Sequence, residues 1–278
     1  MLDPITTIIV LIAVGLGAGT LGSMIGVGGG IILVPALTFL GLSPTQTAST
    51  GLIAVASTSV SSTIEYSRQR RIDYRLGIEM AAFAIPGAVL GAYISGYLTE
   101  ESFKLYFGVL LLLTGIYVLY KNSILKDSAA KKRSTTLRAA AFAATFGAGI
   151  ISSLFGVGGG IIFVPAMLLV LGLSMQRAAP TSQLTLMMTS IAGVLTHGFL
   201  GHPDYFQAAV LSAGAFVGAQ IGSRASRTTK EVLLQRLLGL ALIVVAIEFI
   251  IDWLTSKLLG NVVLAALAFG IHVHGHSK

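Results

Sequence analysis

Three features of the sequence predict an all-α polytopic membrane protein, built as two inverted repeats of about five apolar segments each. Hydrophobic residues make up 54% of the 278 residues and charged residues only 10%, whereas a soluble domain carries about 25% charged residues. The apolar residues come in long, nearly uncharged runs, as expected for membrane-spanning helices. The third feature is a glycine-rich motif that occurs twice.

The apolar runs divide into ten segments, five on each side of a polar linker. Most have the roughly 20 residues that a bilayer crossing requires, but the second segment of each half is too short to cross comfortably. The segments are Ile5–Met24, Ile31–Leu42, Ala48–Tyr66, Leu76–Leu98, Phe103–Tyr120, Ala139–Phe155, Ile161–Leu173, Ala178–Leu200, Tyr205–Ser223 and Leu233–Leu254. We divide the chain into a first transmembrane repeat (1–120), a basic cytoplasmic linker (121–138), a second transmembrane repeat (139–254) and a C-terminal tail (255–278).

Basic residues are concentrated in three loops, at residues 68–75, 121–138 and 224–236, which hold most of the 18 Lys and Arg residues. Cytoplasmic loops of membrane proteins collect such residues, so we expect these loops in the cytoplasm and the N-terminus outside. The linker and the third loop share a side only if an even number of crossings separates them. The chain therefore has to break between Ala139–Phe155 and Ile161–Leu173, and the shorter segment either crosses or folds back as a re-entrant hairpin.

The glycine-rich motif lies at the predicted break in each half. Gly26–Pro35 reads GVGGGIILVP and Gly156–Pro165 reads GVGGGIIFVP, with one difference. A repeat of this length indicates internal duplication. Because each half has an odd number of crossings, the second copy is inserted upside down, an arrangement common in secondary transporters. The loop at residues 198–205, the expected outer counterpart of the first basic loop, contains no Lys or Arg.

Three consecutive glycines in each motif predict that the helix is interrupted there. A glycine inside a helix costs about 1 kcal/mol relative to alanine, and unwound backbone within a bilayer is tolerated only against protein or a water-filled cavity. The helix that restarts at Ile31 or Ile161 offers free N–H groups and a positive dipole end, which attract anions. Pro35 and Pro165 are expected within about the first turn of that helix, where a missing N–H costs little. The alternative is that the glycines form only a close-packing seam.

The sequence resembles the sulfite exporter TauE/SafE family of membrane proteins over about residues 5–254. The resemblance rests on the doubled glycine motif, on ASTGL at Ala48–Leu52 and APTSQL at Ala179–Leu184, and on RRIDY at Arg70–Tyr74. It implies a secondary transporter that exports small sulfur-containing anions, such as sulfite or sulfonates like sulfoacetate. The sequence alone leaves open which anion is carried, in which direction, and with which coupling ion.

The candidate substrate-binding residues are the motif glycines, the polar residues at the start of the third segment of each repeat, and one basic residue near the second motif. Hydroxyl and amide donors suit a sulfonate because they bind its oxygens without a fixed counter-charge. The alternative is that they hydrogen-bond to a neighbouring helix or to their own backbone. The predicted residues are Gly28, Gly29, Gly30, Ser49, Thr50, Gly158, Gly159, Gly160, Thr181, Ser182, Gln183 and Arg177. The first copy has Gly51 where the second has Ser182, so the hydroxyl contact is expected only in the second copy.

Few ionisable residues lie inside the apolar runs. Glu65 and Glu79 are expected to pair with the arginines of the first basic loop. Glu248 or His197 can couple proton movement to transport, since an acid within a membrane is a functional candidate by default; a packing role is the alternative. Substrate charge is expected to be met mainly by helix N-termini and neutral donors, because no Lys or Arg lies in the middle of an apolar run.

Other classes of protein are disfavoured. The net charge of +7 reflects the basic loops rather than a nucleic-acid site. Gly17, Gly19 and Gly22 spell GxGxxG, but no strand precedes them, so nucleotide binding is not expected. A histidine-rich tail with His272, His274 and His276 is expected to be solvated rather than a metal site. We predict no enzyme activity, no cofactor and no metal.

The expected partners are a small anion and the lipid bilayer of the cell membrane, with homo-oligomerisation left open. An anion channel or an uptake carrier with the same glycine site is an alternative function. A membrane-embedded enzyme is a further one, although it would require a nucleophile and base deep in the spans. The apolar stretch Leu258–Ile271 is short and is expected to lie along the membrane surface.

Overall fold

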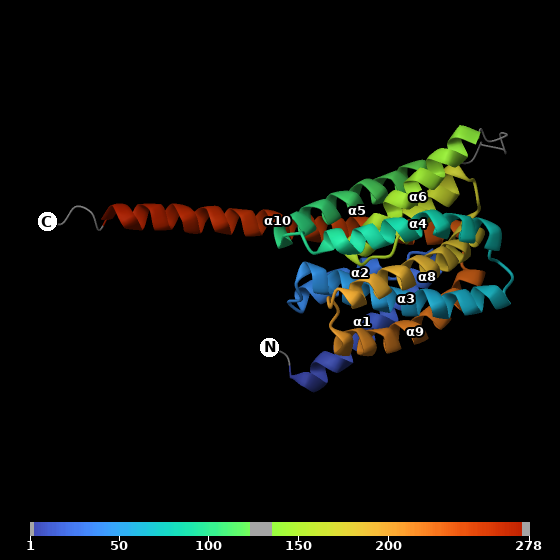
Figure 1. Cartoon of the computed structure of the whole chain (residues 1–278), viewed down its shortest axis with the longest axis horizontal. Helices are drawn as coiled ribbons and strands as arrows, with labels where there is room; N and C mark the ends of the chain where they lie inside the picture. Colours follow the sequence, from blue (N-terminus) through green and yellow to red (C-terminus); the bar gives the residue numbers. More distant parts are fainter. Residues whose placement is uncertain (1–2, 123–134, 274–278) are drawn as a thin grey trace.

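The computed structural model describes residues 3–122 and 135–273, and this part of the chain is all helical, as predicted (Figure 1). It contains ten α-helices, one π-helical turn and no strand. The elements are α1 (Pro4–Ile25), α2 (Gly30–Phe39), α3 (Pro44–Arg68), α4 (Tyr74–Ser95), α5 (Glu100–Asn122), α6 (Thr135–Phe155), α7 (Gly160–Pro165), the π-turn η2 (Ala166–Val170), α8 (Met175–Phe199), α9 (Tyr205–Thr228) and α10 (Glu231–Val273). Most of the basic linker predicted at 121–138 lies outside the described residues.

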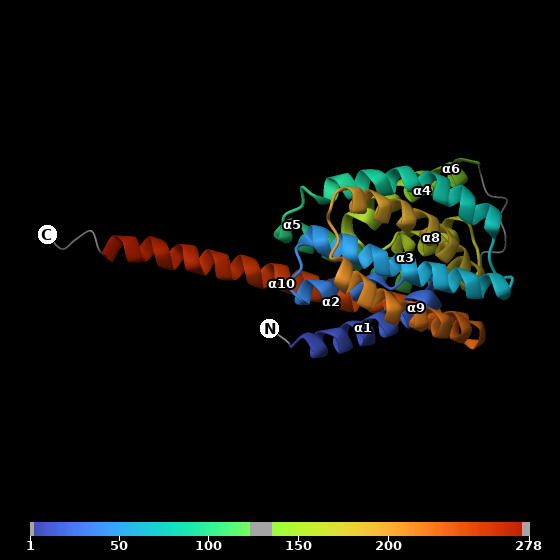
Figure 2. The same ribbon diagram turned by 60° about the horizontal axis from the view of Figure 1, so that its bottom comes forward.

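Six long helices form three adjacent pairs, which Figures 1 and 2 show from two directions. The central pair is α3 with α8. It is flanked by α9 and α1 on one side and by α4 and α6 on the other. Each pair joins a helix from the first half of the chain to one from the second half. The two halves therefore share one core.

Glycines bring the outer pairs into backbone contact. A Cβ added at Gly19 in α1 would overlap the carbonyl O of Ala215 in α9, and one added at Gly15 would overlap that of Leu211. Residue numbers rise together along the two helices, so α1 and α9 run parallel. In the same way, Gly87 and Gly91 of α4 lie against α6, which also runs parallel to α4. Small residues at these contacts allow the close approach that helices make in membranes.

The remaining long pair, α5 and α10, is antiparallel, because Gly108 lies beside Phe249 and Gly115 beside Leu242. Phe249 also makes an edge-on contact with Phe107, with ring centroids 5.0 Å apart. α10 has 43 residues and continues unbroken past the bundle, as both ribbon views show. The stretch Leu258–Ile271, predicted to lie separately on the membrane surface, is therefore the continuation of α10.

Three described helices are long enough and apolar enough to span a membrane by themselves: Ile5–Ile25, Tyr74–Ser95 and Val232–Thr255. The helices α3 and α8 do not meet this criterion, although each has 25 residues. Both are rich in Ser and Thr, which lowers their hydropathy. These hydroxyl groups are mostly buried, so the two most polar long helices lie in the centre of the bundle.

The predicted breaks are present in both halves. α1 ends at Ile25 and α2 begins at Gly30, and α6 ends at Phe155 while α7 begins at Gly160. The expected place of the prolines was wrong. Pro35 lies inside α2, and Pro165 is the last residue of α7, where the helix changes from α to π geometry. A proline beyond the first turn removes one backbone hydrogen bond, but only the helix after Pro165 becomes irregular, since α2 stays α-helical to Phe39.

We expect Gly19→Ala to destabilise the folded protein by about 1–3 kcal/mol, because the added methyl group overlaps the backbone of α9. Gly17→Ala is the matched control, since nothing lies within 4 Å of a Cβ at Gly17. The midpoint of thermal unfolding in detergent reports the difference. Equal midpoints for the two variants would mean that the α1–α9 contact does not depend on glycine.

Candidate functional site

The two glycine motifs meet in the protein interior. A Cβ added at Gly30 would overlap the backbone of Val157, and one added at Gly160 would lie 2.6 Å from the Cα atom of Val27 and 2.7 Å from the carbonyl O of Gly26. All ten residues of the two GVGGG segments are buried. Each motif therefore packs against the backbone of the other, which only glycine allows at these positions.

The motif backbones adopt conformations that favour glycine. Gly28 has a φ of +81° and Gly158 a φ of +76°, a left-handed region in which other residues are strained. Gly26 also adopts it and ends α1, where its N–H donates to the carbonyls of Gly22 and Ser23. The left-handed caps thus separate each long helix from the short helix that follows.

Several buried N–H groups at the start of the short helices have no acceptor among the described residues. In the first motif these belong to Gly29, Gly30 and Ile31, and in the second to Gly159, Gly160 and Ile161. Buried backbone N–H groups in proteins are nearly always paired. Two sets of unpaired donors at the junction of two helix starts favour a site for a hydrogen-bond acceptor.

One side chain from each central helix lies against both motifs. A Cβ added at Gly28 would be 2.9 Å from Cγ1 of Val55 in α3 and 3.2 Å from Cδ1 of Leu186 in α8. A Cβ added at Gly158 would be 2.7 Å from the same Val55 atom and 3.0 Å from Cδ2 of Leu186. Val55 and Leu186 occupy corresponding positions in the two halves. They fill the space between the motifs in this conformation.

Three of the predicted polar residues bind backbone carbonyls. Ser182 donates to the carbonyl O of Gly26 at 2.7 Å, and the Gln183 amide donates to that of Gly22 at 3.0 Å. The Ser49 hydroxyl donates to carbonyls of its own helix. Gly51 lacks the hydroxyl of its counterpart Ser182, and a Cβ there would be 3.2 Å from the carbonyl O of Gly156. Side chains of the second half thus donate hydrogen bonds to the backbone around the first motif. Gly51 of the first half cannot donate an equivalent hydrogen bond to the second motif.

The predicted threonines anchor two loops. The hydroxyl oxygen of Thr50 accepts from the N–H of Asp204 at 3.1 Å, and that of Thr181 accepts from the N–H of Asp73 at 3.0 Å. Asp73 and Asp204 in turn cap the first turns of α4 and α9. These matched contacts hold the start of each central helix to a loop from the other half.

Two hydroxyl donors that sequence analysis missed lie directly before the second motif. Ser152 and Ser153 are fully buried, and their hydroxyl groups have no partner among the described residues. In the sequence, only their place indicates a role: Ser152 lies four residues and Ser153 three residues before Gly156. They add donors to a region that already contains unpaired N–H groups.

Arg177 does not join the buried residues: its side chain is exposed on the first turn of α8. Arg71 is a basic residue that does enter the bundle. Its guanidinium donates to the carbonyl and side-chain oxygens of Gln176 and to Ser226 at 3.1 Å, and it lies 5.3 Å from the ring centroid of Tyr66. Burial lowers the pKa of Arg71, although a guanidinium remains charged in proteins. Sequence analysis had placed Arg71 only in a basic loop.

The predicted partners of the acidic residues were partly right. Glu79 pairs with Arg75 at 3.0 Å, as expected. Glu65 instead pairs with Arg224 at 3.4 Å, in the third basic loop rather than the first. The packing of α3 on α9 brings these two loops together.

The opposite end of α8 carries two histidines in contact. His197 is fully buried, its Nδ1 lies 3.0 Å from Nδ1 of His202, and its Nε2 lies 3.0 Å from the carbonyl O of Ser153. Burial lowers the pKa of His202, which lies in the loop before α9. The predicted candidate His197 therefore has a partner that sequence analysis did not identify.

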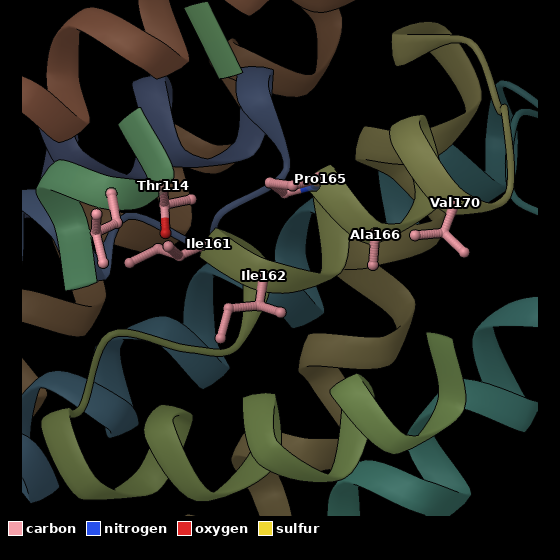
Figure 3. A pocket seen from close by; sticks show the side chains of 7 residues that line it. Thr114, Ile161, Ile162, Pro165, Ala166 and Val170 are labelled. Carbon is pink, nitrogen blue, oxygen red and sulfur yellow. The ribbon is translucent and has the colours of Figure 1, made fainter. Parts of the chain in front are cut away.

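Two pockets lie beside the short helices. A pocket of about 290 Å³ is lined by Thr114 of α5 and by apolar residues of α7 and η2 (Figure 3). A second, of about 180 Å³, lies beside α2 and is lined by Glu248, Lys104 and Asp252, among other residues. Lys104 pairs with Asp252 at 2.8 Å. The structure thus groups Glu248 with a buried lysine that sequence analysis did not single out.

Broken helices from two halves, meeting with unpaired donors in a shared helical core, are typical of membrane transport proteins. The chain belongs to the sulfite exporter TauE/SafE family, whose family model matches residues 11–249. The resemblance inferred from the glycine motifs is confirmed.

Curated relatives carry transporter names. The chain is 29% identical to the probable membrane transporter protein YunE of Bacillus subtilis over 270 residues, which cover 89% of this chain and 99% of that protein. It is 25% identical to the probable membrane transporter protein YfcA of Escherichia coli strain K12 over 248 residues, covering 87% and 89% of the two chains. No solved structure matches the chain.

We expect Arg71→Gln to lower the thermal stability of the protein, because it removes a charged donor from Gln176 and Ser226. Hydrogen bonds from charged groups contribute about 1.5–3 kcal/mol each. Arg177→Gln is the matched control and should leave the unfolding midpoint unchanged, since Arg177 is exposed. If Arg177→Gln lowered the unfolding midpoint more than Arg71→Gln did, Arg71 would not be the anchored arginine.

Proposed function

We propose that this protein is a secondary transporter that exports small sulfur-containing anions, sulfite or sulfonates such as sulfoacetate, across the cell membrane. The observation that carries the proposal is the set of buried N–H donors without acceptors where the two motifs meet. An anion there would accept hydrogen bonds from helix starts whose dipoles favour negative charge. The membership in a sulfite exporter family supports this substrate class.

We further propose that the two halves are inverted repeats of a polytopic membrane protein. In support, corresponding helices point in opposite directions: α3 and α8 are antiparallel, with Leu52 beside Gly193 and Val55 beside Leu186, and α5 and α10 are antiparallel as well. The contacts also correspond, since α1 packs on α9 as α6 packs on α4. Inversion brings equivalent motifs together from opposite sides of the bilayer, where transporters of this plan bind substrate.

The donors near the motifs favour a weakly basic, multi-oxygen anion. They are neutral N–H and O–H groups. Of the two described cations that enter the bundle, Arg71 lies beyond the end of α3, and Lys104, beside α2, is paired with Asp252. Each helix start supplies about half a unit of positive charge, so two together match a monoanion. Motion of Val55 and Leu186, which fill the space between the motifs, would then open the site to each side in turn.

Uptake into proteoliposomes across a panel of sulfite, sulfoacetate, taurine, sulfate and thiosulfate tests the function. We expect saturable, counter-transported flux of sulfite or a sulfonate. Flux that does not saturate would indicate a channel instead. The absence of flux for every sulfur-containing anion would overturn the proposed substrate class.

We expect Gly28→Ala and Gly158→Ala to abolish anion binding, because their methyl groups would meet Val55 and Leu186 between the motifs. Gly41→Ala is the matched control. Gly41 has a φ of +83°, so alanine is strained there as at Gly28, but nothing lies within 4 Å of its Cβ. Binding of radiolabelled sulfite, with size-exclusion profiles as a check of folding, reports the outcome. Normal binding by both motif variants would show that the glycines are packing residues.

Single cysteines test the proposed orientation, and the native chain contains none. Leu200→Cys in the α8–α9 loop should react with an impermeant thiol reagent from outside the cell. Arg75→Cys, at the exposed start of α4, should react only after the membrane is opened. The opposite pattern would contradict an N-terminus outside and a cytoplasmic linker.

A further inference from the structure

The two ends of the central helices carry the same arrangement of groups with different chemistry. At one end, Tyr66 donates to the carbonyl O of Ser23 at 2.7 Å, and Arg71 lies over its ring. At the other end, His197 corresponds to Tyr66 and Ser153 to Ser23. Nε2 of His197 lies 3.0 Å from the carbonyl O of Ser153. His202 occupies the position of Arg71, and its ring centroid lies 5.3 Å from that of His197. One end therefore has a permanent cation where the other has a titratable group.

The contacts of His197 fix where its protons are. A carbonyl oxygen can only accept, so Nε2 of His197 carries a hydrogen toward Ser153. One hydrogen can lie between the two Nδ1 atoms at 3.0 Å. In the neutral pair this hydrogen belongs to His202, because a neutral imidazole has only one N–H.

This geometry accepts one further proton without breaking a hydrogen bond. The proton bonds to Nε2 of His202, which is partly exposed. The N–H bond at Nδ1 of His202 then breaks as one forms at Nδ1 of His197. His202 ends neutral and His197 ends as an imidazolium, with one proton and one positive charge gained. A second proton would place two N–H groups against each other.

Burial disfavours a positive charge on this pair, and two helix ends offset part of that cost. His197 lies in the last turn of α8, and Ser153 lies in the last turn of α6, so two helix C-termini face the imidazolium. Close to His202 in the sequence, the ionisable groups are Asp204, whose carboxylate accepts from the N–H of Gln207, and Tyr205. α4 and α10 also pack on α8, and their described ionisable residues include Glu79, Tyr93, Glu248 and Asp252. The adjoining parts of α6 (142–155) and α3 (44–57) contain no ionisable residue. The carbonyl of Ser153, which accepts from the imidazolium, lies three residues before Gly156 of the second glycine motif.

We propose that the His197–His202 pair is a proton-binding site that sets how strongly an anion binds at the outer end of the protein, an inference that rests on the proposed transport function and orientation. When the outer solution is acidic, the charged pair attracts an anion to that end of the protein, as Arg71 does permanently at the cytoplasmic end. In a neutral outer solution the pair loses its proton and its attraction, so an exported anion leaves; an acidic outer solution holds the anion at this end and slows export.

Proton binding is tested without any substrate, by NMR titration of the full-length protein labelled at histidine Cε1. We expect two signals, removed by His197→Gln and His202→Gln, that shift together as the pair takes up a single proton below pH about 6.5. His272→Gln serves as the control, and should leave both signals in place. Independent titration of two protons, or unchanged titration of His197 in the His202→Gln variant, would overturn the proposed site.

Coupling is tested by transplanting the cytoplasmic pair to the outer end, as the double variant His197→Tyr and His202→Arg. In proteoliposomes, lowering the outer pH from 7.5 to about 4.5, well below the ordinary histidine pKa of about 6.5 because burial lowers the pKa of His202, should raise sulfite binding from outside about fivefold in the native protein, the scale of one charge at a helix end. The double variant should bind strongly at both pH values. An equal pH response in the two proteins would refute the coupling. A native protein that carries no anion would refute the proposed function, while the NMR titration still decides the proton site.

Discussion

Unwound backbone inside an apolar helix bundle has to be supported on every side, and the rest of the structure depends on this constraint. Each glycine motif leaves peptide groups that its own helices cannot pair. The support comes from the other half of the chain: Gly30 packs against Val157, and the carbonyl of Gly26 receives the hydroxyl of Ser182. Neither half can supply this alone, which explains why the halves share one core instead of forming two domains.

The same frame carries different groups at its two ends, and in our proposal this difference makes anion binding at the outer end depend on pH. Matched hydrogen bonds from Asp73 to Thr181 and from Asp204 to Thr50 hold the central helices in equivalent ways. The frame differs where an arginine on one side is replaced by a histidine on the other. A symmetric frame offers two similar states, and unequal charges at its ends allow a proton gradient to favour one of them.

Much of the fold was predictable from the sequence, because apolar runs and consecutive glycines act locally. The breaks before Gly30 and Gly160 and the pairing of Arg75 with Glu79 follow from composition and helical spacing. The partner of Glu65 could not be predicted in this way, because Arg224 comes near Glu65 only through the packing of α3 on α9. The entry of Arg71 into the bundle and its equivalence to His202 were missed as well. Aligning the two halves residue by residue would have revealed that equivalence, since both residues precede an Asp-Tyr pair by the same spacing.

The central claim is that amides from both motifs hold one anion. NMR spectra of the full-length protein labelled at glycine nitrogen, recorded while sulfite is added, test this most directly. The account predicts that the amide signals of Gly29, Gly30, Gly159 and Gly160 shift together with a single dissociation constant, while that of Gly17 stays fixed. Shifts confined to one motif, or an anion that binds without moving either set, would contradict it.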